Sequence, residues 1–201
     1  MTRPHLHPPC TQALRLQRGF TLLELMVVVL IIGLGLSVIA IAVGRDNDSV
    51  VRTEAQNFIS KSEFVAEQAV LGREIIGLFI EPRTGSGSLD THWCYRWQRF
   101  RNNNWQEANE NLGEYCLPAT ISIELVVEDE PYEYDPDLEQ QPPVLVFYPS
   151  GEATLLELAL YPTRPELRQD EEIQRIRIDM MGEIRWENRE RELEDERLGR
   201  S

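Results

Sequence analysis

Lysine is almost absent from this chain of 201 residues, which contains Lys61 and no other. Proteins that bind a nucleic-acid backbone need clustered lysine and arginine, and this chain carries a net charge of −14 instead. The composition therefore argues against a nucleic-acid partner.

Residue types that build catalytic centres are also scarce. Beyond residue 19 there is one histidine, His92, beside Trp93 in an expected loop. Nucleophilic or zinc chemistry needs partner residues that the spacing does not offer. No glycine-rich loop of the phosphate-binding kind is present. We therefore expect no enzyme activity and no cofactor or metal, and we interpret His92 as an ordinary surface residue.

Acidic residues are missing from the first 19 positions, where Arg3, Arg15 and Arg18 lie. An apolar run follows over residues 20–43, with Glu24 as its one charged residue. As a helix this run would span roughly 36 Å, enough to cross a hydrocarbon core about 30 Å thick. The basic leader then predicts a cytoplasmic N-terminus and an external acidic body. A cleaved secretory signal fits less well, because its apolar core should be about 7–15 residues long.

Glu24 needs a partner, because an ionised carboxylate in lipid costs about 2.5 kcal/mol or more. The run itself contains no lysine, arginine or histidine. A cut between Gly19 and Phe20 would create an amine one helical turn from Glu24. The Phe20 amine of a neighbouring subunit could then meet Glu24 as two helices pack, which would make the carboxylate a register device for assembly.

The segment "RGFTLLELMVVVLIIGL" resembles the N-terminal signature of type IV pilins and type II secretion pseudopilins. This resemblance implies that a prepilin peptidase cuts after Gly19 and methylates Phe20, with Glu24 as the acid of the motif. The run lacks the proline found in many major pilins. An ordinary signal anchor with a stray glutamate is the alternative.

A second helix pattern continues from Ser49 to Leu71. Apolar and small residues recur there at spacings of three and four, which is typical of an amphipathic helix facing a core. The polar segment 45–49 could interrupt the helix, with Asp48 or Ser49 as N-cap, and Gly72 suits its end. The core stripe comprises Val51, Ala55, Phe58, Ser62, Val65 and Ala69, and the other face holds Arg52, Glu54, Gln56, Lys61, Glu63, Glu67 and Gln68.

Alternating patterns then predict strands and turns. Trp93, Tyr95 and Trp97 share one strand face, which favours core or interface packing over a ligand platform. A hairpin turn is expected at "RNNN" and a flexible loop at residues 83–88. The expected strands are 74–80, ended by Pro82, then 93–100, a short piece at Trp105, 121–127, 144–148, 154–161, 173–179 and 183–187.

These patterns predict an α+β, pilin-like fold. A long N-terminal helix, with a membrane-spanning half and an amphipathic half, would pack on antiparallel β-sheets. We expect a leader at 1–19, a transmembrane helix at 20–44, a periplasmic domain at 45–187 and a charged, flexible tail at 188–201. A docking segment is the alternative for the tail.

Residues 15–187 resemble the minor pseudopilin H (GspH) group within the GspH/FimT family. The segments that carry this resemblance include "YRWQRF", "PPVLVFYPSGEATLLELAL" and "IRIDMMGEIRW". The resemblance implies a subunit near the tip of a periplasmic pseudopilus, in contact with the minor pseudopilins I, J and K and the major pseudopilin. It places the chain in the inner membrane with a single pass. A type IV pilus minor pilin of the FimT/FimU kind is the alternative, and a membrane-anchored periplasmic enzyme is a remote one.

Cys94 and Cys116 are the cysteines left once Cys10 is removed with the leader. In an oxidising compartment they could form a disulfide, closing a loop worth roughly 3 kcal/mol on the chain-entropy model. Two separate buried thiols are the alternative.

The acidic segment 128–139 could offer oxygen ligands to Ca²⁺, through Asp135, Asp137 and Glu139. It lacks a glycine for a tight ligand loop, and prolines 131 and 136 favour an extended conformation. A solvated loop is therefore the preferred interpretation.

Overall fold

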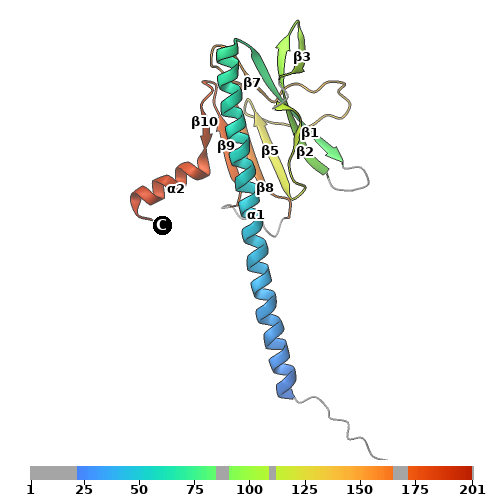
Figure 1. Ribbon diagram of the computed structural model, residues 1–201, viewed down its shortest axis with the longest axis vertical. Helices are drawn as coiled ribbons and strands as arrows, with labels where there is room; N and C mark the ends of the chain where they lie inside the picture. Colours follow the sequence, from blue (N-terminus) through green and yellow to red (C-terminus); the bar gives the residue numbers. More distant parts are fainter. Residues whose placement is uncertain (1–21, 85–90, 109–111, 165–171, 201) are drawn as a thin grey trace, which may run out of the picture. The chain divides into compact units, whose positions relative to one another are not determined.

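The computed structural model describes residues 22–84, 91–108, 112–164 and 172–200, with the backbone alone for Glu24 and residues 33–49 (Figure 1). The chain divides into two units, Met1–Ala42 and Val43–Ser201. Within the first unit, the described residues form the beginning of helix α1. The second unit contains the rest of that helix and two antiparallel sheets.

Helix α1 runs from Leu22 to Gly72, and its backbone stays helical through residues 45–49. The interruption considered there is therefore not present. In the second unit all six positions of the predicted core stripe are buried, as expected for an amphipathic helix packed on a sheet. Gly72 ends the helix as predicted, while the left-handed residue is Arg73, with φ of 52°.

The first sheet contains β1 (Ile75–Thr84), β2 (Thr91–Arg101), β3 (Asn104–Glu107), β4 (Tyr115–Cys116) and β7 (Leu145–Phe147). Its order is β3-β2-β1-β7, and β4 also pairs with β2. The predicted hairpin at "RNNN" is confirmed as the β2–β3 turn. Asn102 and Asn103 occupy it with φ of 51° and 62°, a conformation that asparagine tolerates better than most residues.

Pro82 does not end β1, contrary to the sequence-based expectation. The strand continues to Thr84, and Pro82 lies opposite Trp93 in the β1–β2 ladder. On its other side β1 pairs with β7 only at residues 76–78. Pro82 therefore lies beyond the β7 pairing, where a missing N–H costs no ladder hydrogen bond.

The second sheet contains β5 (Ile121–Val127), β6 (Glu130–Pro131), β8 (Leu156–Pro162), β9 (Gln174–Ile178) and β10 (Ile184–Trp186). Its order is β10-β9-β8-β5-β6. Buried and exposed residues alternate along β5, β8 and β9, as they do in a sheet with one face on a core. The predicted strands at 121–127, 154–161 and 173–179 correspond to these three.

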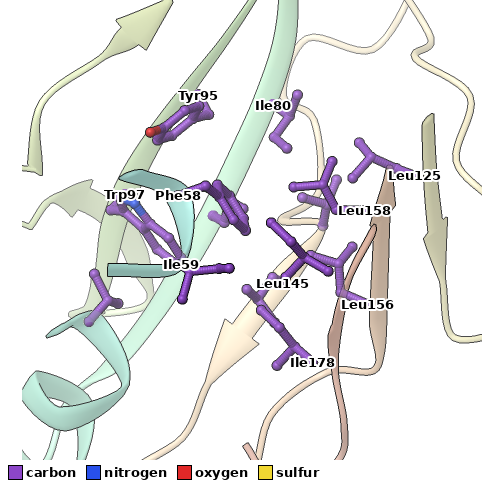
Figure 2. Close-up of a cluster of buried hydrophobic side chains, with 14 of the residues drawn as sticks. Phe58, Ile59, Ile80, Tyr95, Trp97, Leu125, Leu145, Leu156, Leu158 and Ile178 are labelled. Atoms are coloured by element: carbon purple, nitrogen blue, oxygen red, sulfur yellow. The ribbon is translucent and has the colours of Figure 1, made fainter. Parts of the chain in front are cut away.

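One hydrophobic core joins helix α1 to both sheets (Figure 2). Phe58 of α1 contacts Tyr95 of β2 edge-on, with ring centres 5.8 Å apart. Trp97 stacks on Phe147 of β7 at 6.0 Å. Each fully buried aromatic side chain contributes about 1.5–3 kcal/mol relative to exposure. The α+β prediction is therefore confirmed, and Tyr95 and Trp97 are core residues as expected.

The outer face of the first sheet is covered by Trp105. Its ring lies 5.3 Å from Phe79 and 5.1 Å from Phe100, measured between ring centres. A Cβ atom at Gly77 would come within 2.8 Å of the indole. Gly77 is thus required for the close approach of this ring.

Helix α2 (Glu187–Leu198) occupies most of the segment that the sequence suggested to be a flexible tail. It ends at Gly199, a left-handed C-terminal cap with φ of 67°. None of its residues is buried. Local composition therefore gives no apolar stripe from which this helix could have been expected.

Candidate assembly site

The N-terminal motif provides the first part of the candidate assembly site. Gly19 and Phe20 lie outside the described residues, and for Glu24 the structure describes helical backbone within α1. Large hydrophobic side chains at described positions between Leu22 and Ile32 are exposed on the isolated chain. A helix with such a surface requires an apolar environment or a partner.

Among the residues that the structure describes, no helix combines the length and hydropathy needed to cross a membrane.

The position of Glu54 on helix α1 differs from the one predicted. It was expected on the polar face of α1, but its exposure is only 8%. The hydroxyl of Tyr115 on β4 donates to both carboxylate oxygens, at 2.9 Å and 2.8 Å. This hydrogen bond supplies the partner that a buried carboxylate requires. The contact also ties strand β4 to helix α1.

Lys61 lies two helical turns beyond Glu54 on α1, over the rings of Tyr115 and Tyr95. Its Nζ is 4.2 Å from the centre of the Tyr115 ring and 5.3 Å from that of Tyr95, within the range of cation–π attraction. Burial lowers the pKa of Lys61, and the Glu54 charge opposes this shift. Burial, the hydrogen bond to Glu54 and the Glu54 charge raise the pKa of Tyr115 to about 12.

Cys94 and Cys116 face each other directly across the β2–β4 ladder and are joined as a disulfide. Cys116 follows Tyr115, so the bond and the Glu54 contact hold adjacent residues of one two-residue strand. Together they fix β4 between β2 and helix α1. We call Glu54, Lys61, Tyr95 and Tyr115 the helix–strand cluster.

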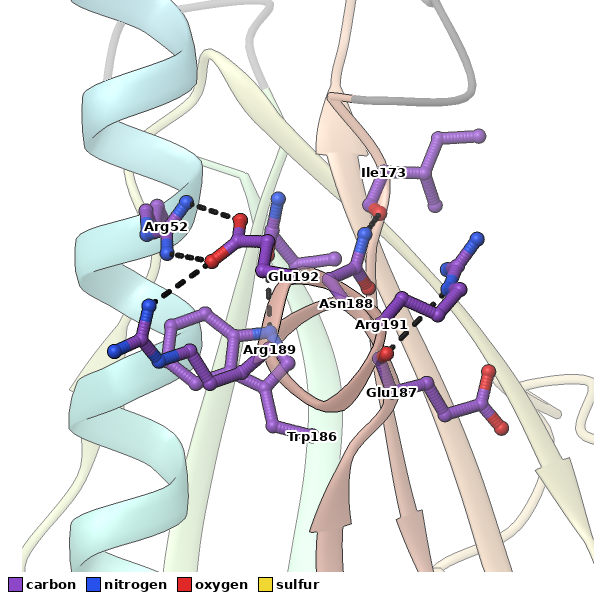
Figure 3. A network of polar contacts seen from close by, with 9 residues as sticks. Arg52, Ile173, Trp186, Glu187, Asn188, Arg189, Arg191 and Glu192 are labelled. Atoms are coloured by element: carbon purple, nitrogen blue, oxygen red, sulfur yellow. Dashed lines mark hydrogen bonds and ion pairs between the residues drawn. The ribbon is translucent and has the colours of Figure 1, made fainter. Parts of the chain in front are cut away.

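Helix α2 reaches α1 through a second polar group (Figure 3). Arg52 of α1 donates two hydrogen bonds to Glu192 of α2, both at 2.7 Å, in the bidentate geometry that arginine favours. Its guanidinium also lies 5.5 Å from the centre of the Trp186 ring. At the start of α2, Asn188 donates to the Ile173 carbonyl at 2.7 Å and accepts from the Arg175 N–H at 2.8 Å. The tail is therefore held at two places.

Other sequence-based candidates are not brought together. His92 was expected in a loop, but it lies on β2 opposite Arg83. In the acidic segment, Asp135 accepts the Asp137 N–H at 2.9 Å, a local turn contact. Across the described residues no group of three or more histidine, cysteine or acidic side chains is arranged to hold a metal ion.

The sequence and the fold both match known proteins. A family model described as "Prokaryotic N-terminal methylation motif" matches residues 14–40. The chain is 26% identical to "Type II secretion system protein H" of Aeromonas hydrophila, over 89% of this chain and 97% of that protein. It is 29% identical to the protein of that name from Pectobacterium carotovorum subsp. carotovorum, over 70% of this chain and 79% of the relative.

A crystal structure of the minor pseudopilin EpsH from the type II secretion system of Vibrio cholerae shares the fold. The TM-score is 0.53 at 17% sequence identity, covering 69% of this chain and 94% of that chain. The relatives favour the pseudopilin interpretation over a type IV pilus minor pilin. The methylation motif, the relatives and the pseudopilin-like fold agree, and the chain is similar to type II secretion system protein H over most of its length.

Proposed function

We propose that this chain is a membrane-anchored, non-enzymatic subunit of the pseudopilus of a type II secretion system. One observation carries the proposal: a prepilin-type methylation motif at residues 14–40 leads into a helix whose later half forms the core of a pseudopilin-like domain. Such a chain can supply a filament spine and a folded head. The similarity to type II secretion system protein H supports a role in the secretion of folded proteins.

The anchor is the part of this proposal that follows from the sequence. Cleavage after Gly19 and methylation of Phe20 would leave residues 20–44 as a single inner-membrane helix, with the acidic domain in the periplasm. The apolar side chains exposed between Leu22 and Ile32 support this role, since lipid or neighbouring helices would cover them. In assembly, Glu24 would pair with the Phe20 amine of an adjacent subunit.

The expected partners are those of the relatives that this chain resembles. A minor pseudopilin H would occupy a position close to the tip and contact the minor pseudopilins I, J and K and the major pseudopilin. The prepilin peptidase would be its processing partner. No nucleic acid is expected, given the acidic composition.

The test is complementation of a strain that lacks this gene, with release of a folded secreted protein as the measurement. Mass spectrometry of the mature protein should find methylated Phe20 at the amino terminus. Gly19→Leu should block processing and secretion together, because a side chain would enter a pocket that accepts glycine. The matched control Gln17→Leu should process normally. Full secretion without this gene, or with an unprocessed chain, would overturn the proposal.

A further inference from the structure

Three turns that meet at one end of the second sheet surround one hollow of about 440 Å³. The register places them together, because Val127 pairs with Leu156, which in turn pairs with Ile178. The last residues of β5, the segment before β8 and the last residues of β9 therefore meet at one end of the sheet. We call this hollow the turn pocket; the residues that line it include Glu128, Asp129, Tyr148, Glu152, Met180 and Met181.

The turn between β9 and β10 is fixed by the residues at its two ends. The Gly182 N–H donates to the Asp179 carbonyl at 2.9 Å, and the Asp179 carboxylate accepts the N–H groups of Met181 and Glu183 at 2.9 Å and 3.0 Å. Gly182 has φ of 76°, and a Cβ atom there would lie 2.4 Å from the Gly151 carbonyl oxygen. Asp179 and Gly182 thus determine the turn conformation, and the side chains of the two residues between them are not needed for it.

Those two residues are nevertheless methionines, exposed at 68% for Met180 and 79% for Met181. Turn tips normally carry small or polar residues. Tyr148, also exposed, lines the same pocket. Adjacent exposed apolar side chains mark interaction surfaces, and methionine adapts its shape to different partners. Hydrogen bonds within the turn hold its backbone, so this apolar surface is formed in the isolated chain.

The turn between β5 and β6 adds charge at a conformational cost. Glu128 and Asp129 have φ of 52° and 68°, where glycine or asparagine is favoured. The β2–β3 turn of this protein uses that favourable choice, with Asn102 and Asn103 at similar angles. The backbone of the acidic turn is held by the Glu128 N–H, which donates to the Leu155 carbonyl at 3.0 Å. Glu128 and Asp129 thus occupy a left-handed backbone conformation that glycine or asparagine would adopt with less strain.

Charge of one sign surrounds the methionines. Glu128, Asp129 and Glu152 are the charged residues that line the turn pocket, and all three are exposed acids. Within the described part of the chain, no arginine or lysine forms an ion pair with Glu128 or Asp129. A partner that covers the methionines would therefore bring its own charges close to these carboxylates, and only positive charges would be favourable there.

We propose that the turn pocket docks a segment of another protein in which an apolar side chain lies between lysine or arginine residues. The apolar side chain would pack on Met180 and Met181, and its basic neighbours would pair with Glu128, Asp129 and Glu152. This inference concerns a surface of the folded domain and does not depend on the proposed role in a pseudopilus.

The methionines provide a direct measurement, since the chain contains four, at positions 1, 26, 180 and 181. The full chain, labelled with ¹³C at the methionine methyl groups and held in a neutral detergent, is titrated with the peptide Arg-Arg-Leu-Phe-Arg-Arg. Met180→Leu and Met181→Leu assign the two signals. We expect both signals to shift, while that of Met26 does not. A peptide with glutamate in place of each arginine should leave all of them unchanged.

A pair of variants separates binding from folding. Glu128→Asn with Asp129→Gly should weaken the peptide complex at least 10-fold at low salt and raise the melting temperature, because both new residues favour the turn conformation. The matched control, Glu63→Gln with Glu67→Gln, makes the same change in net charge on the exposed face of α1 and should leave affinity within 2-fold. Equal weakening by both pairs, equal binding of the acidic peptide, or unshifted Met180 and Met181 signals would each overturn the proposal.

Discussion

The Tyr115 hydroxyl donates to the buried carboxylate of Glu54 across 61 residues of sequence, at 2.8 Å to the nearer oxygen. Tyr115→Phe removes this donor and leaves the carboxylate buried without it. We expect the free energy of unfolding to fall by about 1–3 kcal/mol, the usual cost of an unsatisfied buried group. Denaturant unfolding of the full chain in detergent measures the change. Tyr148→Phe is the control, and its exposed ring should give a change within about 0.5 kcal/mol.

The same contact predicts a loss of stability in alkali. The folded-state pKa of Tyr115 is raised to about 12, above the ordinary tyrosine value of 10.0, so the folded chain binds this proton more tightly than the unfolded chain. The resulting stabilisation is complete below pH 10 and is lost as the pH rises toward 12. Burial raises the pKa of Tyr95 as well.

Absorbance at 295 nm should therefore show tyrosines that ionise late, together with unfolding. In Tyr115→Phe one late-ionising group should be missing. Simultaneous ionisation of all tyrosines near pH 10 in the folded chain would contradict this prediction.

Cys94 and Cys116 should be oxidised in periplasmic protein. Mass analysis without reductant should recover their peptides linked, two hydrogens lighter than the free pair. Replacing both by alanine should cost roughly 3 kcal/mol of stability, because the unfolded chain regains the entropy of an open loop. Two free thiols in protein isolated under oxidising conditions would rule out the bond.

Helix α2 should detach when its contact with α1 is weakened. Glu192→Gln removes the charge that pairs with Arg52, and amide hydrogen exchange in residues 189–198 should accelerate several-fold. Because both side chains are partly exposed, we expect global stability to fall by no more than about 1 kcal/mol. The control is Glu196→Gln on the same helix, which should leave exchange unchanged. Slow exchange in both variants would show that Asn188 alone holds the helix.

Glu24→Leu should separate insertion from assembly. It removes the desolvation cost of the acid, so membrane insertion and cleavage at Gly19 should continue. Cross-linking to partner subunits should fall, because the Phe20 amine of a neighbour would be left unpaired in an apolar spine. Val28→Leu is the control for packing. Normal cross-linking and secretion in Glu24→Leu would show that the carboxylate does not set the register, and failed cleavage would assign it to peptidase recognition.

Periodic patterns allowed much of the fold to be predicted. The stripe from Val51 to Ala69 and the alternation along β5 depend on local spacing, and both are reproduced in the structure. Glu54 was placed on the wrong face because its partner, Tyr115, is distant in sequence. The α2 contact could not be expected for the same reason, since 140 residues separate Arg52 from Glu192. The turn pocket likewise combines three turns that are separated in sequence, and none of them alone indicates a pocket.

Lys61 has a practical consequence for studying this subunit. Apart from the amino terminus, its side chain supplies the only primary amine of the chain, and it lies half-buried over two tyrosine rings. Cross-linkers that react with lysine will therefore detect few or none of the contacts that this subunit makes, even where the contacts are close. Its neighbours should be mapped instead with reagents that couple carboxyl groups, which the acidic surface offers in abundance.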